Sequence, residues 1–271
     1  PKWLQYKLRS IGLKPINNIV DITNFVLHET GHPLHAFDFN KIKDSKVIVR
    51  NAKKGEKIET LDSCVLELSV EDLIIADAEK PICLAGVIGG LNSAVDSHTK
   101  NIFLESAFFD PTFIRKTAKK HSINSESSYR FERGIDFNYS QFALQRAATL
   151  IRDLCQGVIS NEVLFDSKKL TLSCIDFSFT NCNKILGFSI PENEMLNILV
   201  DLGFEIISQS KGGVKVLTPS YRCDVNREID VVEEIARIYG YDNLPSSNKI
   251  SFQPLFDQKK SVYDLKKDIS M

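Results

Sequence analysis

Near its start the chain has a helical pattern of apolar residues, which two helix-breaking residues end. Residues 16–30, INNIVDITNFVLHET, place apolar side chains three and four positions apart, which is typical of one helix face. Gly31 is placed to end this helix, and Pro33 prevents the next turn from forming. His28 and His32, four positions apart, therefore cannot form a zinc pair on one helix face. The segment predicts a helix that leads into a histidine-bearing loop.

The pattern after this loop changes to short strands. Residues 46–90 contain brief runs of Val, Ile and Leu, broken by Gly, Asp and Lys. Asp110 followed by Pro111 predicts a helix start, because proline at the first helical position loses no hydrogen bond. A longer helix is predicted over residues 139–155, with Gly157 ending it. This order lacks the alternation of βαβ units and predicts an α+β fold with a mixed sheet.

A second domain is predicted where charge returns and a new strand begins. The pattern there indicates a strand, two helices, a pair of strands around Gly212 and Gly213, and a helix that Gly240 ends. That order is typical of a small winged-helix-like domain, a fold often used to bind DNA. We predict domains at residues 1–168 and 169–246, followed by a linker at 247–271 toward a further module. The opening PKWLQYKLRS lies in mid-pattern, so we expect an internal piece of a longer protein.

Composition excludes some classes of protein. Hydrophobic residues make up 43% of the 271 residues and charged residues 25%, as in globular proteins, and no apolar run approaches the ~20 residues of a membrane span. The net charge of −1 argues against binding nucleic acid through bulk electrostatics. Six cysteines without a C-x-x-C pair predict reduced thiols, to which we give no catalytic role, and we expect a cytoplasmic protein without membrane contact.

Four carboxylates near the end of the second domain are a candidate metal site. Asp230, Glu233 and Glu234 lie on one face of the predicted helix, and Asp224 precedes it. Oxygen ligands of this kind suit Mg²⁺. The same acids are also explained by the helix dipole and by pairing of Glu233 with Arg237 one turn on.

Three other segments leave alternatives open. The segment LAGVIGG is a turn or a place where its glycines let a ligand approach, and it lacks the patterns of dinucleotide and phosphate loops. Glu105 interrupts an apolar strand, either at an edge facing water or in a pocket. The segment SSYRFERGID mixes aromatic and basic residues, as both RNA surfaces and salt-bridged cores do.

Five segments in register carry a resemblance to a known family. They are DITNFVLHETGHPLHAFDFNKI, LAGVIGG, LESAFFDPTFIRKTA, SSYRFERGID and LTPSYRCDVNREIDVVEEIARIYGYDNLP. Together they closely resemble the β subunit of bacterial phenylalanine–tRNA ligases over residues 11–245. The resemblance implies that the first domain is an editing domain that removes tyrosine wrongly attached to tRNA(Phe), and that the histidine loop holds no metal.

The resemblance also implies functional residues at defined positions. The implied catalytic residues are His35, Glu105, Asn24 and Thr23, and the implied substrate-binding residues are Gly86, Gly89, Ser125 and Ser127. Glu105 would bind the tyrosine hydroxyl, which phenylalanine lacks, and a site built in this way can discriminate by ~10⁴-fold or more. The others would hold the ester carbonyl and the attacking water, with a ribose hydroxyl as an alternative to a protein base. Ser127 stands where the family commonly has a small residue such as alanine, and Ser125 where it often has threonine.

At the level of the whole enzyme, the resemblance implies an ATP-dependent ligase. Its partners would be tRNA(Phe) and an α subunit, in a heterotetramer of two α and two β subunits. The family's Mg²⁺ site, shared with the α subunit, would fall on Asp224, Asp230, Glu233 and Glu234. The alternatives are a non-catalytic module that docks the α subunit and tRNA, and DNA binding, which the many acids of the second domain disfavour.

Overall fold

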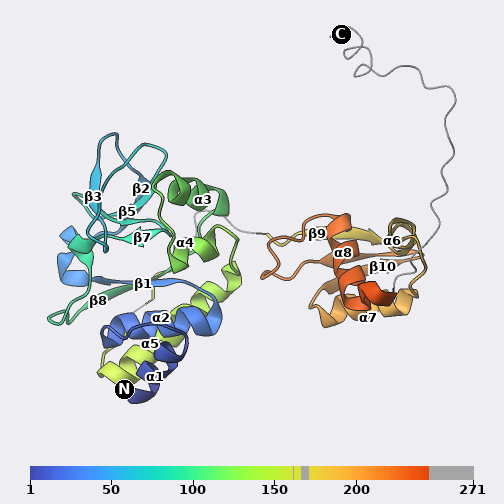
Figure 1. The fold of residues 1–271 in the computed structure, drawn as a ribbon, viewed down its shortest axis with the longest axis horizontal. Coiled ribbons are helices and arrows are strands. Elements are labelled where there is room, and N and C mark those ends of the chain that lie inside the picture. Colours follow the sequence, from blue (N-terminus) through green and yellow to red (C-terminus); the bar gives the residue numbers. More distant parts are fainter. Residues whose placement is uncertain (161, 166–170, 244–271) are drawn as a thin grey trace, which may run out of the picture.

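The structure is a computed structural model that describes residues 1–160, 162–165 and 171–243 (Figure 1). Its elements form two groups with separate hydrophobic cores, one before residue 156 and one after residue 173. Within the part of the chain that the structure describes, no helix is long and apolar enough to cross a membrane. The predicted α+β class is confirmed, since helices and several sheets occur together. The predicted mixed sheet was wrong, because the strand pairs among the described residues are all antiparallel.

Three helices pack together at the N-terminal side of the first group. They are α1 (Lys2–Ser10), α2 (Asn18–Thr30) and α5 (Ser140–Cys155). As predicted, Gly31 ends α2 in the left-handed conformation, with φ of 74°. The residue that ends α5 in this conformation is Gln156, at φ 57°, so the predicted Gly157 was wrong by one position.

The sheets of the first group are antiparallel, and the order of strands is not sequential. A four-stranded sheet has the order β2 (Ile48–Asn51), β5 (Leu73–Ala76), β6 (Pro81–Leu84) and β7 (Ile88–Gly89). A hairpin pairs β3 (Lys57–Glu59) with β4 (Val65–Glu67), and a separate ribbon pairs β1 (Leu34–Asp38) with β8 (Ile102–Ser106).

Short 3-10 helices occur in both groups. They cover Phe39–Lys41, Lys43–Ser45, Leu91–Ser93 and Phe137–Tyr139 in the first group and Tyr241–Asn243 in the second.

Two further helices of this group contribute side chains to the same core as the four-stranded sheet. They are α3 (Pro111–Lys120) and α4 (Glu126–Phe131). The predicted start of α3 is confirmed, because the Asp110 side chain accepts a hydrogen bond from the Thr112 amide at 2.8 Å and Pro111 is the first helical residue. Ile114 of α3 and Phe131 of α4 are buried in this core.

The second group has three strands and three helices, in the predicted order. Its elements are β9 (Cys174–Ser178), α6 (Phe179–Leu186), α7 (Glu192–Asp201), β10 (Glu205–Ser210), β11 (Gly213–Leu217) and α8 (Glu228–Tyr239). The antiparallel sheet has the order β10-β11-β9. The element order alone does not confirm the winged-helix identity. The predicted boundary at 168/169 and the linker at 247–271 lie outside the described residues.

Candidate active site

The β1–β8 ribbon brings two predicted site residues face to face. In this antiparallel pair His35 lies directly opposite Glu105, and Phe37 lies opposite Phe103. Residues directly opposite each other project from the same face of a ribbon. The His35 ring packs edge-on against Phe37, with ring centroids 4.5 Å apart. One face of the ribbon therefore presents an imidazole and a carboxyl group side by side.

This face borders a cavity of about 40 Å³. His35 and Glu105 line it from the ribbon, and Ser127 lines it from α4. Gly86, in the turn between β6 and β7, and Gly89, in β7, complete this set. Five of the predicted site residues thus meet in one pocket, although they come from four separate segments of the sequence. Glu105 lies in the pocket and not at an edge facing water, which decides between the two interpretations of its strand.

Glycine is required at two positions of the pocket wall. Gly86 has φ of +66°, and a Cβ there would lie 2.8 Å from carbon atoms of Ile114 and Phe109. A Cβ on Gly89 would lie 2.5 Å from Cε1 and 2.7 Å from Nε2 of His35. The segment LAGVIGG is therefore both a turn and the surface against which the His35 ring rests.

The polar atoms of the pocket lack partners. Among the described residues, neither His35 Nε2 nor Glu105 Oε2 has a hydrogen-bond partner, and both atoms are buried. Burial raises the pKa of Glu105 to about 8 and lowers the pKa of His35 to about 4. Both side chains are therefore mainly uncharged at pH 7. Buried polar atoms without partners are costly and uncommon, so two in one cavity indicate a ligand that supplies the missing hydrogen bonds.

Other predicted site residues lie elsewhere. Thr23 and Asn24 are on α2 and do not line the cavity, and the Thr23 hydroxyl donates to the Val20 carbonyl at 3.0 Å. Ser125 caps α4 by accepting from the Ser128 amide, and its hydroxyl donates to the Val87 carbonyl at 2.6 Å. The structure thus explains Ser125 by local folding, and it does not bring these three residues to the cavity.

The cavity also has apolar walls that sequence reasoning missed. Cys83 of β6 lines it, together with Phe109 and Phe131, whose rings pack edge to face at 5.1 Å. Burial, with a smaller effect of Glu105, raises the pKa of the Cys83 thiol well above its usual value, so the thiol stays protonated. No sequence signal marked Cys83, because β6 is buried along its whole length and has no alternation of polar and apolar residues.

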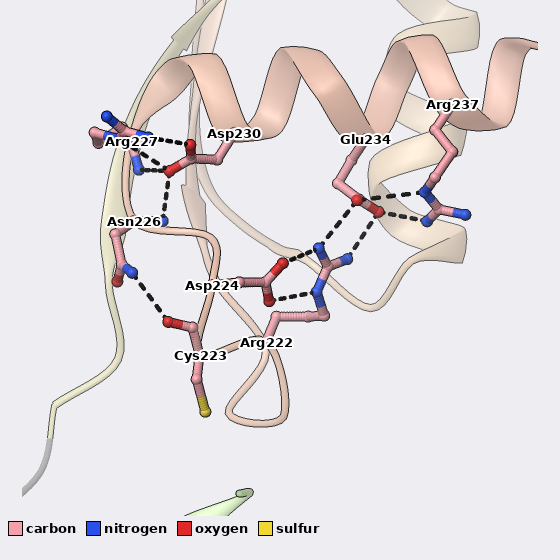
Figure 2. A network of polar contacts seen from close by, with 8 residues as sticks. All are labelled: Arg222, Cys223, Asp224, Asn226, Arg227, Asp230, Glu234 and Arg237. Carbon is pink, nitrogen blue, oxygen red and sulfur yellow. Dashed lines mark hydrogen bonds and ion pairs between the residues drawn. The ribbon is translucent and has the colours of Figure 1, made fainter. Parts of the chain in front are cut away.

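The four carboxylates of the predicted metal site have different surroundings, and Figure 2 shows three of them, Asp224, Asp230 and Glu234. Arg222 binds both Asp224, at 2.9 and 2.6 Å, and Glu234, at 3.0 and 2.7 Å. Glu234 also accepts from Arg237. These arginines lower the pKa of Glu234 to about 2, and Arg222 lowers the pKa of Asp224.

The two remaining carboxylates of this set lie apart from Arg222. Asp230 accepts hydrogen bonds from the amides of Asn226 and Arg227 and so caps α8, and Glu233 is exposed. The alternative prediction paired Arg237 with Glu233. In the structure Arg237 pairs with Glu234 instead.

A metal ion does not fit this arrangement of side chains. Across residues 1–160, 162–165 and 171–243, no three His, Cys, Asp or Glu side chains gather as a metal-binding group. Mg²⁺ needs oxygen ligands that converge in near-octahedral geometry at ~2.1 Å. Here guanidinium groups take up the oxygens of Asp224 and Glu234, and Asp230 serves the helix end. Asp224 and Glu234 are therefore placed as partners of arginine.

Comparison with known protein families divides the chain at the same place as the two groups of elements. The family model of the B3/4 domain matches residues 1–156, and that of the tRNA synthetase B5 domain matches residues 175–241. The chain therefore belongs to the B3/4 domain family, and we call residues 175–241 the B5 domain after the model that they match. The predicted resemblance to phenylalanine–tRNA ligase β subunits is confirmed by curated relatives of that name.

Two such relatives show the extent of the similarity. The β subunit of Protochlamydia amoebophila is 44% identical over 272 residues, which is 97% of this chain and 34% of the relative. That of Carboxydothermus hydrogenoformans is 44% identical and covers 98% of this chain and 34% of the relative. The chain thus spans about a third of the length of these relatives. A solved N-terminal fragment of the Pyrococcus horikoshii β subunit aligns with a TM-score of 0.40 and 17% identity, over 82% of this chain and 65% of that one.

Proposed function

We propose that the B3/4 pocket hydrolyses tyrosine from tyrosyl-tRNA(Phe), as the editing site of a phenylalanine–tRNA ligase. The observation that carries this proposal is that His35 Nε2 and Glu105 Oε2 are buried, unpartnered and at the same cavity. An interaction module has no need for two unsatisfied polar atoms at one cavity, because each costs free energy until a ligand or a bound water pairs with it. The β-subunit relatives supply the substrate class.

Discrimination between tyrosine and phenylalanine rests on Glu105. With its pKa raised to about 8, this side chain is mainly a neutral carboxylic acid at pH 7. It can accept the phenolic O–H at its carbonyl oxygen or donate its own proton to the phenolic oxygen. Phenylalanine would leave the carboxyl group buried and unpaired, and sites of this kind reject the analogue without the hydroxyl by ~10⁴-fold or more.

Hydrolysis needs an oriented water and a polarised ester. Water attacks the carbonyl carbon, the bond from that carbon to the ribose oxygen breaks, and free tyrosine and tRNA with a free ribose hydroxyl result. His35 is neutral, with its pKa lowered to about 4, so Nε2 hydrogen-bonds the water or the ester without carrying a charge. A ribose hydroxyl of the tRNA is available to take the proton. Thr23 and Asn24 stay predicted as residues that hold the ester.

The proposal places the chain in a larger enzyme. That enzyme joins phenylalanine to tRNA(Phe) with ATP and Mg²⁺, in the cytoplasm, as a heterotetramer of two α and two β subunits. Its support is the name that the relatives share and the match of the B5 domain of tRNA synthetases. Within the enzyme, this chain would receive the charged end of the tRNA and the α subunit would make the ester.

The test is release of tyrosine from tyrosyl-tRNA(Phe) by the chain. We expect hydrolysis by the unaltered chain and at least ~100-fold less by Glu105→Ala and by His35→Ala. Glu71→Ala, at an exposed turn, is the matched control and should keep full activity. Release that survives both pocket substitutions contradicts the assignment. No release at high enzyme concentration, together with binding of tRNA, favours the docking module.

A further inference from the structure

We infer that Arg222 is the internal cation of the B5 domain, and that its guanidinium holds Asp224 and Glu234 in place of Mg²⁺. Arg222 makes two contacts with each carboxylate, from 2.6 to 3.0 Å (Figure 2). The planar guanidinium matches the geometry of a carboxylate, and such paired contacts are the strong form of this interaction. One arginine thus bridges a loop residue and a residue of α8.

The charges of this cluster already balance. Arg222 and Arg237 carry two positive charges, and Asp224 and Glu234 carry two negative charges, with both pKa values lowered. A divalent cation placed between the two carboxylates would stand beside the Arg222 guanidinium and repel it. Mg²⁺ that used the lone pairs facing Arg222 would have to displace the guanidinium from both carboxylates.

Burial makes Arg222 hard to displace. Glu234 has 6% of its surface exposed, and the Arg222 side chain has 20%. A buried carboxylate without a partner is strongly unfavourable, so Glu234 depends on its two arginines. The Arg222 amide also donates to the Pro219 carbonyl at 3.0 Å, within the turn between β11 and α8. The arginine therefore fixes this turn on the helix, as a structural metal would.

The first experiment measures Mg²⁺ binding to the unaltered chain by calorimetry, with thermal unfolding in EDTA and in millimolar MgCl₂. We expect no saturable heat and the same unfolding temperature of the B5 domain in both buffers. Saturable binding that Asp224→Asn or Glu234→Gln abolishes would overturn the inference.

A second experiment removes the arginine. Arg222→Gln leaves Asp224 and Glu234 facing each other, so Mg²⁺ should now raise the unfolding temperature of the B5 domain, or restore its folding if the variant is unfolded without the ion. Arg227→Gln is the matched control, because Arg227 pairs with Asp230 at the helix end and should bring no response to Mg²⁺. Arg222→Lys keeps the charge and should fold without Mg²⁺. If Arg222→Gln shows no response to Mg²⁺, the guanidinium does not stand where the ion would bind, and the inference fails.

Discussion

Glu105 of the B3/4 domain and Glu234 of the B5 domain are carboxyl groups with opposite surroundings. In the B3/4 pocket, Glu105 is half-buried, its Oε2 atom is buried without a partner among the described residues, and its pKa is raised to about 8. In the B5 domain, Glu234 is buried, but Arg222 and Arg237 bind it and its pKa is lowered to about 2. One carboxyl group is mainly neutral at pH 7 and lacks a partner for one oxygen, whereas the other is charged and bound by two arginines. Under the proposed function, the first belongs to a binding site and the second to a network that stabilises the fold.

The first prediction is an opposite dependence on pH of the contributions that Glu105 and Glu234 make to the stability of their domains. Glu105 binds its proton more tightly in the folded state, so its contribution to stability is full below pH 4.5 and is lost as the pH rises toward 8, by about 5 kcal/mol. Glu234 is the reverse: its contribution is full above pH 4.5 and is lost as the pH falls toward 2, by about 3 kcal/mol. The lowered pKa of His35 has a separate effect: the B3/4 domain loses stability as the pH falls from 6.5 to 4, because the unfolded state binds this proton more tightly.

Each domain can be followed separately in this pH experiment. Trp3 is the only tryptophan of the chain and lies in α1, so its fluorescence during urea unfolding follows the B3/4 domain. Hydrogen exchange of α8, corrected for the intrinsic rate, follows the B5 domain. Glu105→Gln should remove the alkaline loss and leave α8 unchanged. An alkaline loss of the same size in Glu105→Gln would contradict the assignment to this carboxyl group.

The second prediction concerns a substitution that removes the charge of Glu234, the carboxylate that two arginines bind. Glu234→Gln should destabilise the B5 domain by ~3 kcal/mol, because it takes the charge from a buried network and leaves two arginines short of a partner. Glu233→Gln, one position earlier and exposed, is the matched control and should change stability by less than ~0.5 kcal/mol. The measurement is the unfolding of α8 by hydrogen exchange in both variants. Equal effects at 233 and 234 would show that the arginine network contributes little.

The third effect concerns the wall of the pocket. Gly89→Ala would place a Cβ 2.5 Å from Cε1 of His35, so the imidazole must move, at a cost of ~1–3 kcal/mol. We expect tyrosine release to fall at least ~10-fold, since small displacements of a catalytic group are costly. Gly157→Ala is the control, because its nearest neighbour would be 3.7 Å away. Unchanged release in Gly89→Ala would show that the position of the His35 ring does not govern the reaction.

Local signals in the sequence predicted the ends of elements better than the sites. Gly31 and Asp110 mark helix ends through backbone conformation and capping, which depend only on neighbouring residues. The facing of His35 and Glu105 depends on the register of two strands far apart in the sequence, and a slip by one residue would turn one side chain away. Only the resemblance placed them in one pocket.

The carboxylates of α8 show a second limit of prediction from the sequence. Helical spacing put Asp230, Glu233 and Glu234 on one face, but it could not indicate which of them an arginine would bind. Arg222 lies in the turn before α8, and its reach to Glu234 depends on how that turn folds back. The pattern of acids was therefore visible, and the partner that decides their role was not.

The last prediction separates the roles of two serine hydroxyls, one in substrate discrimination and one in folding. Ser127 lines the cavity and Ser125 caps α4, so two hydroxyls only two positions apart have different surroundings. Ser127→Ala should change the ratio of tyrosine to phenylalanine release a few-fold, about 1 kcal/mol, because one hydrogen-bonding group leaves the pocket. Ser125→Ala should lower the stability of the B3/4 domain by ~1 kcal/mol and leave the ratio unchanged. The ratio is measured with both charged tRNAs, and a constant value in Ser127→Ala removes Ser127 from the discriminating surface.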